Sequence, residues 1–246
     1  MDIILTLETM TRLILLFLSV YLFHRTYSPP VGNFKIPALG PSFSEKREWL
    51  LLWLARYVYP SVKTAYMTVT FLECLFIIVT HYFDNPSRIF LAEYLPFPIK
   101  TPQPSPSYVA TFGLLTGITG GLLRISSYKA LGDAFTFNLT QTSPKLITTG
   151  PYSLVRHPSY LGMSLTSIGV SVYHLSPGSW LRESSILQSS LWKIAVGLWI
   201  LMTVFAPNIS LALRADDEDQ LMKRMFGKEW EAWRKVVRYK IYPGLY

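Results

Sequence analysis

Residues 150–162 read GPYSLVRHPSYLG, and they decide where the fourth apolar segment of this chain begins. Gly150-Pro151 is a turn signal, because the residue before a proline is pushed out of the helical region. Pro158 suits the first turn of a helix, where its missing N–H costs nothing. The pattern therefore predicts a helix that starts at Pro158, with His157 near its N-cap. The unpaired N–H groups of such a helix end are expected to bind an anion.

The composition around this stretch is typical of a membrane protein. Of the 246 residues, 50% are hydrophobic and 15% are charged, whereas soluble domains carry about 25% charged residues. A net charge of +8 would suggest nucleic acid in a soluble protein, but the basic residues here lie between apolar runs. We therefore expect a lipid bilayer as partner and no nucleic acid. The single cysteine, Cys74, excludes an intrachain disulfide, and no metal-ligand spacing is present.

Apolar segments predict an all-α integral membrane protein with about five transmembrane helices and a cytosolic C-terminal amphipathic helix. Crossing a bilayer takes roughly 17–25 residues. The segments that reach this length are about 3–23, 62–83, 108–128, 158–176 and 188–213. A shorter run at 49–59 ends at Pro60, and we expect it to lie in the interface or to form a re-entrant piece.

We expect two regions in the chain. Residues 1–128 hold the first three spans, and residues 129–246 hold a cofactor loop, the last two spans and the C-terminal helix. Glu8 and Arg12 are four residues apart in the first span, so they are expected to share a face and to neutralise each other.

Basic residues predict the topology. Residues 24–63, residues 124–157 and the tail from 214 together hold eighteen Lys and Arg, whereas the opposite connections hold three. The positive-inside bias therefore places the Arg-His-Pro loop and the C-terminus in the cytosol.

The tail continues the last span with a second polar stretch. Arg214 and Glu218 are four residues apart, which places them on one face of a continuing helix. Apolar residues recur at helical spacing further on, and they predict an amphipathic helix on the membrane or over the bundle. A plainer interpretation stays open: the acidic residues form a solvated cluster, and Glu218 is spent on a salt bridge to Arg214. Arg156 and His157 also have a plainer interpretation, as interfacial anchors within an aromatic belt.

The two stretches together resemble a known family. KLITTGPYSLVRHPSYLG at 145–162 and RADDEDQLMKRMFGKEWEAWRKVV at 214–237 are similar to the isoprenylcysteine carboxyl methyltransferases. They are also similar to the wider group of small membrane methyltransferases that includes phospholipid N-methyltransferases. The resemblance covers about 130–243, and over the first hundred residues only the number and order of spans supports it. It implies methyl transfer from S-adenosylmethionine to the C-terminal carboxylate of prenylated cysteine proteins, in the endoplasmic reticulum membrane.

The resemblance also implies the residues of the site. Arg214 and Glu218 are the implied catalytic residues, with Arg214 facing the substrate. The implied cofactor-binding residues are Pro144, Lys145, Leu146, Ile147, Tyr152, His157, Pro158, Ser159, Tyr160 and Glu218. No metal is implied. The family commonly has His where Pro144 stands, and its upstream Gln corresponds to Thr140 or Gln141.

Two other functions remain open on the sequence. A phospholipid or other small-molecule membrane methyltransferase has an amine nucleophile, which needs a base near Arg214. A non-enzymatic membrane scaffold, or a sterol-reductase-like relative without activity, would bind no S-adenosylmethionine.

Overall fold

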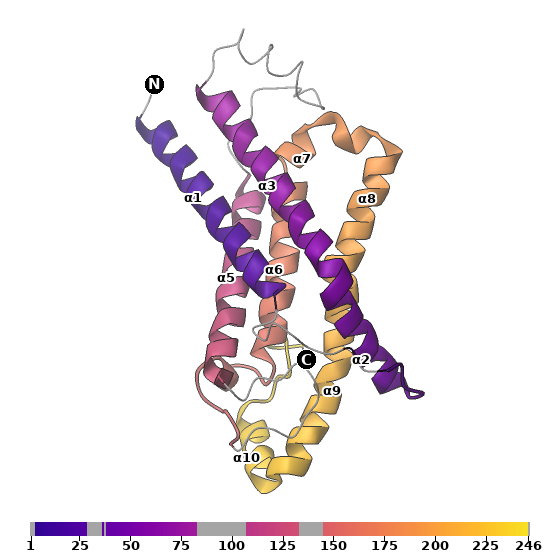
Figure 1. The fold of residues 1–246 in the computed structure, drawn as a ribbon. Coiled ribbons are helices and arrows are strands. Elements are labelled where there is room, and N and C mark those ends of the chain that lie inside the picture. Colours follow the sequence, from indigo (N-terminus) through magenta and orange to yellow (C-terminus); the bar gives the residue numbers. More distant parts are fainter. Residues whose placement is uncertain (1–2, 29–35, 37, 83–106, 133–144, 246) are drawn as a thin grey trace.

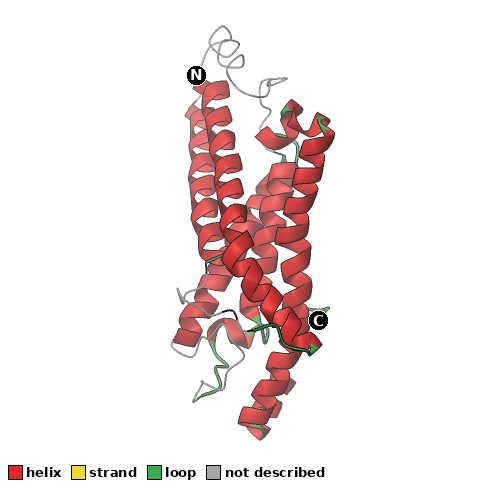
Figure 2. Ribbon diagram, turned by 45° about the vertical axis from the view of Figure 1, so that its right-hand side comes forward, coloured by secondary structure: helices red, strands yellow, loops and turns green. Residues whose placement is uncertain are grey.

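The computed structural model describes residues 3–28, 36, 38–82, 107–132 and 145–245, and among them the regular structure is helical, without a β-strand (Figure 1). The expected all-α class is confirmed. The helices are α1 (Ile3–Thr26), α2 (Phe43–Trp53), α3 (Tyr59–Tyr82), α5 (Tyr108–Leu131), α6 (Pro158–Leu175), α7 (Trp180–Glu183), α8 (Ser190–Ile200), α9 (Ala206–Phe226) and α10 (Lys228–Val236). The long helices run lengthwise side by side, as Figure 2 shows.

Within the part of the chain that the structure describes, four helical runs are long and apolar enough to cross a bilayer. They are Leu7–Thr26, Glu45–His81, Tyr108–Leu131 and Ser190–Phe226. The fifth expected span is α6, which packs against α1, α5 and α9 and buries most of its small and polar side chains. A helix shielded from lipid by its neighbours can carry hydroxyl groups, provided that they find partners. Thr166 and Ser171 do so, each donating to the carbonyl one turn back at 2.8 Å.

The expectation of a re-entrant piece at 49–59 is wrong, whereas a position in the membrane interface stays a prediction. These residues belong to one helical run from α2 through a π-helical turn, Leu54–Val58, into α3. Pro60 has no N–H to donate, and its ring clashes with the carbonyl four residues back. The π-helical turn lies directly before this proline, where Tyr59 donates its N–H to Leu54 O. This wider turn lets the helix continue past the proline.

Small residues bring the backbones of α5 and α6 into contact. A Cβ atom at Gly169 would lie 2.3 Å from the backbone nitrogen of Gly117, and one at Gly120 would lie 2.5 Å from that of Thr166. Helices in lipid associate through close packing rather than through the hydrophobic effect, and small residues make that packing possible. The position of α6 therefore depends on glycine at these contacts.

We predict that Gly169→Ala lowers the stability of the chain, because its methyl group overlaps the α5 backbone. Overpacking of this kind costs about 1–3 kcal/mol. Gly197→Ala on α8 is the matched control, since nothing lies within 4 Å of its added Cβ. The midpoint of thermal unfolding in detergent is the measurement. Equal midpoints for the two variants would show that the α5–α6 contact is looser than described.

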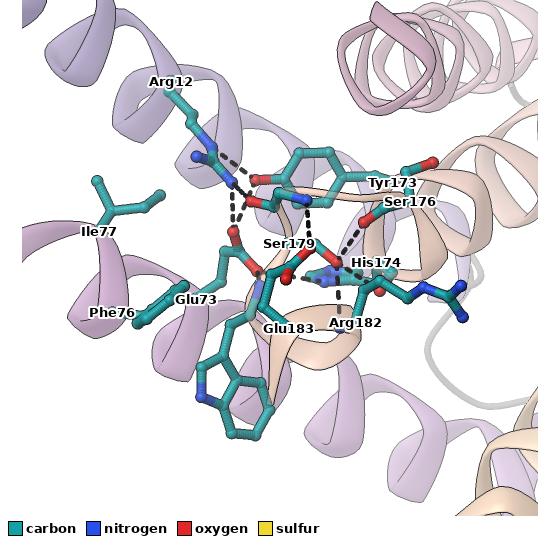
Figure 3. Close-up of polar contacts among 12 residues, drawn as sticks. Arg12, Glu73, Phe76, Ile77, Tyr173, His174, Ser176, Ser179, Arg182 and Glu183 are labelled. Atoms are coloured by element: carbon teal, nitrogen blue, oxygen red, sulfur yellow. Dashed lines mark hydrogen bonds and ion pairs between the residues drawn. The ribbon is translucent and has the colours of Figure 1, made fainter. Parts of the chain in front are cut away.

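A buried ion pair joins several helices at the end of the bundle where α7 lies (Figure 3). Arg12 of α1 contacts Glu73 of α3 through Nη2 and Oε1 at 2.5 Å, so the expected pairing of Arg12 with Glu8 is wrong. Tyr173 of α6 donates its hydroxyl to Glu73 at 3.1 Å and accepts from Arg12 Nε at 2.9 Å. The backbone N–H of Trp180 donates to the other oxygen of Glu73 at 2.6 Å. Buried charges are tolerated when they are paired in this way, and the pair joins α1, α3, α6 and α7.

We expect Arg12→Met to be strongly destabilising, since it leaves the fully buried Glu73 without its cation. Breaking one partner of a buried pair costs about 3–5 kcal/mol. The double variant Arg12→Met/Glu73→Gln should recover most of this loss, because the amide oxygen still accepts hydrogen bonds without a charge. Arg25→Met, an exposed position of the same helix, is the control. Thermal unfolding of a double variant that is no better than Arg12→Met would contradict the assignment.

The connections rich in basic residues meet at the other end of the bundle. Arg124 near the end of α5 donates from Nε to Thr26 O at the end of α1, at 2.9 Å. Its Nη1 reaches Ser159 in the first turn of α6, also at 2.9 Å. α2, α9 and α10 lie at this same end, opposite the N-terminus in Figure 1. The basic segments thus share one end of the molecule, and the cytosolic orientation of that end stays a prediction.

Candidate active site

The Arg-His-Pro turn starts α6 as expected. His157 is the N-cap residue, and Pro158 occupies the first helical position. Tyr160 and Leu161 both donate their N–H groups to His157 O, at 3.0 and 3.3 Å. These two N–H groups are engaged within the turn and are not free for an anion, and anion binding at this helix end stays a prediction. The side chains around the turn, rather than its helix end, define the site.

His157 lies between two carboxylates of α9. Its Nδ1 is 3.2 Å from Glu218 Oε2, and its Nε2 is 3.1 Å from Asp219 Oδ1. Carboxylates only accept hydrogen bonds, so both ring nitrogens can donate only when the imidazole is protonated. Burial by itself disfavours that charge, but the hydrogen bonds and the charges of Asp219 and Glu218 outweigh it. The pKa of His157 is therefore raised above its ordinary value of 6.5.

Arg156 anchors the tail of the chain to this turn. Its Nε and Nη2 are each 3.1 Å from Asp219 Oδ2. Its Nη1 donates to Val237 O at 3.0 Å, and the backbone N–H groups of Arg156 and His157 donate to the carbonyls of Tyr239 and Lys240. Arg156 and His157 are 4% and 8% exposed, so the interpretation of this pair as interfacial anchors is wrong. They hold the segment after α10 against the start of α6.

Arg214 and Glu218 face each other on α9, as their spacing predicts. Arg214 Nε donates to Glu218 Oε1 at 2.8 Å, and the hydroxyl of Tyr160 donates to the same oxygen at 2.6 Å. The tail stretch and the Arg-His-Pro turn, about sixty residues apart in the chain, thus form one cluster. The hypothesis that Glu218 is engaged in a salt bridge to Arg214 is confirmed.

Glu48 of α2 is a member of this cluster that the sequence reasoning missed. Arg214 Nη1 donates to both of its carboxylate oxygens, at 3.1 and 2.9 Å. The neighbouring Arg47 pairs with Asp217 of α9. A contact between residues 166 positions apart leaves no local pattern in the sequence that could have drawn attention to it.

The other predicted site residues fall into three groups. Tyr152 is buried, and its burial and the nearby Glu218 carboxylate raise the pKa of its hydroxyl. Ser159 accepts from Arg124 through both its carbonyl and its hydroxyl, so its polar atoms secure α6 to α5. In the loop before the glycine, Leu146 is buried, Ile147 is half-buried and Lys145 is exposed. Pro144, Thr140 and Gln141 lie outside the described residues.

The cluster offers carboxylates, hydroxyls and cations but no metal site. Among the described residues, no group of three or more His, Cys, Asp and Glu side chains is arranged to hold a metal ion. The side chain of Glu218 is 22% exposed, against 7% for Arg214 and 14% for Glu48. A bound molecule would therefore reach the carboxylate of Glu218 most readily.

Comparison with known proteins assigns this half of the chain to a family. Residues 108–229, just under half of the chain, match the model of the phospholipid methyltransferase family. Relatives of this chain are named for the activity that the sequence resemblance suggested. Protein-S-isoprenylcysteine O-methyltransferase B of Arabidopsis thaliana is 29% identical over 133 residues, which are 53% of this chain and 57% of that protein. Its paralogue A is 31% identical over 107 residues, 42% of this chain and 54% of that protein.

A second group of relatives has a different name. Delta(14)-sterol reductase ERG24A of Gibberella zeae is 33% identical over 120 residues, covering 44% of this chain and 25% of that protein. The chain therefore spans a quarter of the length of this reductase and little more than half of the methyltransferases. No solved structure shows a significant match. The relatives of this chain are thus named for two different activities.

We predict that the stability of the chain falls as pH rises through the raised pKa of His157. The imidazolium is stabilised by the folded site, so its contribution is fully present below the unfolded pKa of about 6.5 and is lost above the folded pKa. The imidazole resonance of His157 in NMR spectra of the detergent-solubilised chain reports that pKa directly. Asp219→Asn should lower it and flatten the pH dependence. A His157 that titrates below 6.5 in the parent chain would contradict the doubly paired imidazolium.

Proposed function

We propose that this chain transfers the methyl group of S-adenosylmethionine to the C-terminal carboxylate of prenylated cysteine in proteins. The observation that carries the proposal is the single cluster that Tyr160, Arg214 and Glu218 form with His157 at one end of the membrane bundle. The resemblance to the isoprenylcysteine carboxyl methyltransferases rests on the same residues, and relatives with that name support it.

The residues present fit the proposed cofactor. S-adenosylmethionine supplies an electrophilic methyl group on a sulfonium centre, and it also carries an ammonium group and ribose hydroxyls. Glu218 is the partly exposed carboxylate suited to hold a cation or a hydroxyl group, and its charge is oriented by His157 and Tyr160. Tyr152 supplies an aromatic surface beside it. We assign the loop residues Pro144 to Ile147 to the same pocket on the resemblance alone.

Arg214 is proposed to orient the acceptor carboxylate. An α-carboxyl group has a pKa of roughly 3.3–3.7, so it is ionised at neutral pH and needs no general base. Its oxygen forms a bond to the methyl carbon as the bond from that carbon to sulfur breaks, and a neutral thioether leaves. A guanidinium can hold a carboxylate through two parallel hydrogen bonds and keeps its charge near the membrane. Positioning of this kind can supply up to roughly 7–11 kcal/mol of the barrier.

The location of the cluster suits such a substrate. It lies where α6 begins and where the apolar part of the Ser190–Phe226 run ends. A prenyl chain prefers lipid, whereas its terminal carboxylate must meet a water-soluble cofactor. We propose that this end of the bundle faces the cytosol, as the basic residues predict, in the endoplasmic reticulum membrane.

Methylation of a phospholipid amine is the second candidate. The family description names phospholipids, and Glu48 beside Arg214 supplies the base that an ammonium acceptor would require. The two candidates differ in the product, because an ester releases methanol in mild alkali and an N-methyl group does not.

The purified chain should form an alkali-labile methyl ester when given labelled S-adenosylmethionine and N-acetyl-S-farnesylcysteine. Arg214→Ala should lower kcat/KM by about 100-fold with little effect on cofactor affinity, because it removes an interaction with the reacting substrate. Glu218→Gln should weaken cofactor binding by about tenfold, since it removes a charge-assisted contact. Calorimetry in detergent measures the binding.

Arg224→Ala and Glu231→Gln are the matched controls, because both residues are exposed. Only alkali-stable label would favour the amine acceptor. Absence of cofactor binding, together with consumption of a hydride donor in the presence of a sterol, would favour the activity for which the reductases are named.

A further inference from the structure

Glu48 is hydrogen-bonded to the Nη1 group of Arg214, which an incoming carboxylate would need. Its two oxygens lie 3.1 and 2.9 Å from Nη1 of Arg214, while Glu218 takes Nε at 2.8 Å. Arg214 is 6% exposed in this arrangement. Its guanidinium therefore already faces two carboxylates of the chain, one from its own helix and one from α2.

Charge decides whether a third carboxylate can join them. Arg156, His157 and Arg214 already balance the charges of Glu48, Glu218 and Asp219, so one more carboxylate would add an uncompensated negative charge. Like charges placed together in a partly buried site repel strongly, because water screens them poorly. Glu218 is further held by Tyr160 and His157. Glu48 is therefore the carboxylate that an anionic acceptor would displace.

The position of Glu48 in the fold allows such a displacement. α2 lies outside the contact between α5 and α6, and it reaches α9 through two neighbouring residues, Arg47 and Glu48. The π-helical turn Leu54–Val58 separates α2 from α3. Turns of this kind often mark functional sites inside helices, and a tilt of α2 about this turn would withdraw Glu48 from Arg214.

We propose that Glu48 occupies the acceptor carboxylate position on Arg214 and that an amphiphilic carboxylate substrate displaces it. This inference rests on the proposed function for the identity of the substrate. Glu48 keeps Arg214 oriented and its charge compensated when no substrate is present. It also makes the site selective, because a neutral ligand cannot take its place on the guanidinium.

Removal of the Glu48 charge should tighten the binding of carboxylates only. We expect Glu48→Gln to bind N-acetyl-S-farnesylcysteine about fivefold to tenfold more tightly than the parent, since a displaced partly exposed ion pair accounts for a difference of this size. The methyl ester of the same ligand should bind both proteins equally, which also reports that the variant is folded. Dodecanoate and methyl dodecanoate form a second ligand pair, and calorimetry in detergent measures all four.

Glu45→Gln is the matched control, because it makes the same charge change on the same helix at an exposed position. Glutamine still completes the capping box with Ser42, so this variant should bind every ligand as the parent does. An equal gain in Glu45→Gln would mean that the overall charge, rather than the Glu48 contact, governs binding, and this would overturn the inference.

The remaining outcomes separate the inference from the proposed function. If Glu48→Gln gains affinity for dodecanoate while no variant binds or methylates the farnesyl ligand, the displaced-carboxylate role stands and the proposed function fails. If the parent methylates the farnesyl ligand but Glu48→Gln gains no affinity for either carboxylate, the proposed function stands and this inference fails. A loss of methylation of an amine acceptor in Glu48→Gln, with loss of the acidic limb of its pH profile, would assign Glu48 as a base and also overturn it.

Discussion

The imidazolium of His157 between two carboxylates is the interaction on which this end of the molecule depends. It joins the start of α6 to α9, and Arg156 extends the same junction to the tail of the chain. Three cations and three carboxylates meet here in contact with one another: Arg156, His157 and Arg214 with Glu48, Glu218 and Asp219. An unpaired charge at such a site is costly, so the turn, the helix α9 and α2 come together as a unit. The residues that could perform chemistry are the same residues that hold the helices in place.

α6 connects this cluster to a second buried one at the opposite end. Tyr160 near its start donates to Glu218, and Tyr173 near its end donates to Glu73. Between the two, the glycine contacts with α5 set the position of α6 along the bundle. Because protein rather than lipid surrounds much of α6, its serines and threonines are accommodated. The helix α6, which would be too polar to face lipid, thereby contributes residues to both clusters.

The family model covers only part of the charged cluster around His157 and Arg214. His157, Arg214 and Glu218 lie within residues 108–229, which match the family model, whereas Glu48 lies before them. Relatives that match about half of the chain are named as methyltransferases in one group and as sterol reductases in another. A fold and its function are separable in this way. The residue to which we attribute selectivity for a carboxylate thus comes from the part of the chain that the family model does not cover.

The sequence alone predicted the helical class and the start of α6 at Pro158. It also predicted that Arg214 and Glu218 face each other and that the basic segments share one end of the molecule. Each of these depends on neighbours within about one helical turn or on composition along the chain. The tertiary structure decided the rest: Arg12 pairs with Glu73 rather than Glu8, the 49–59 segment continues into α3, and Glu48 reaches Arg214. Arg12 and Glu73 are 61 residues apart in the chain, and Glu48 and Arg214 are 166 residues apart. Helical periodicity tells which side chains share a face, but it carries no record of which other helix that face will meet.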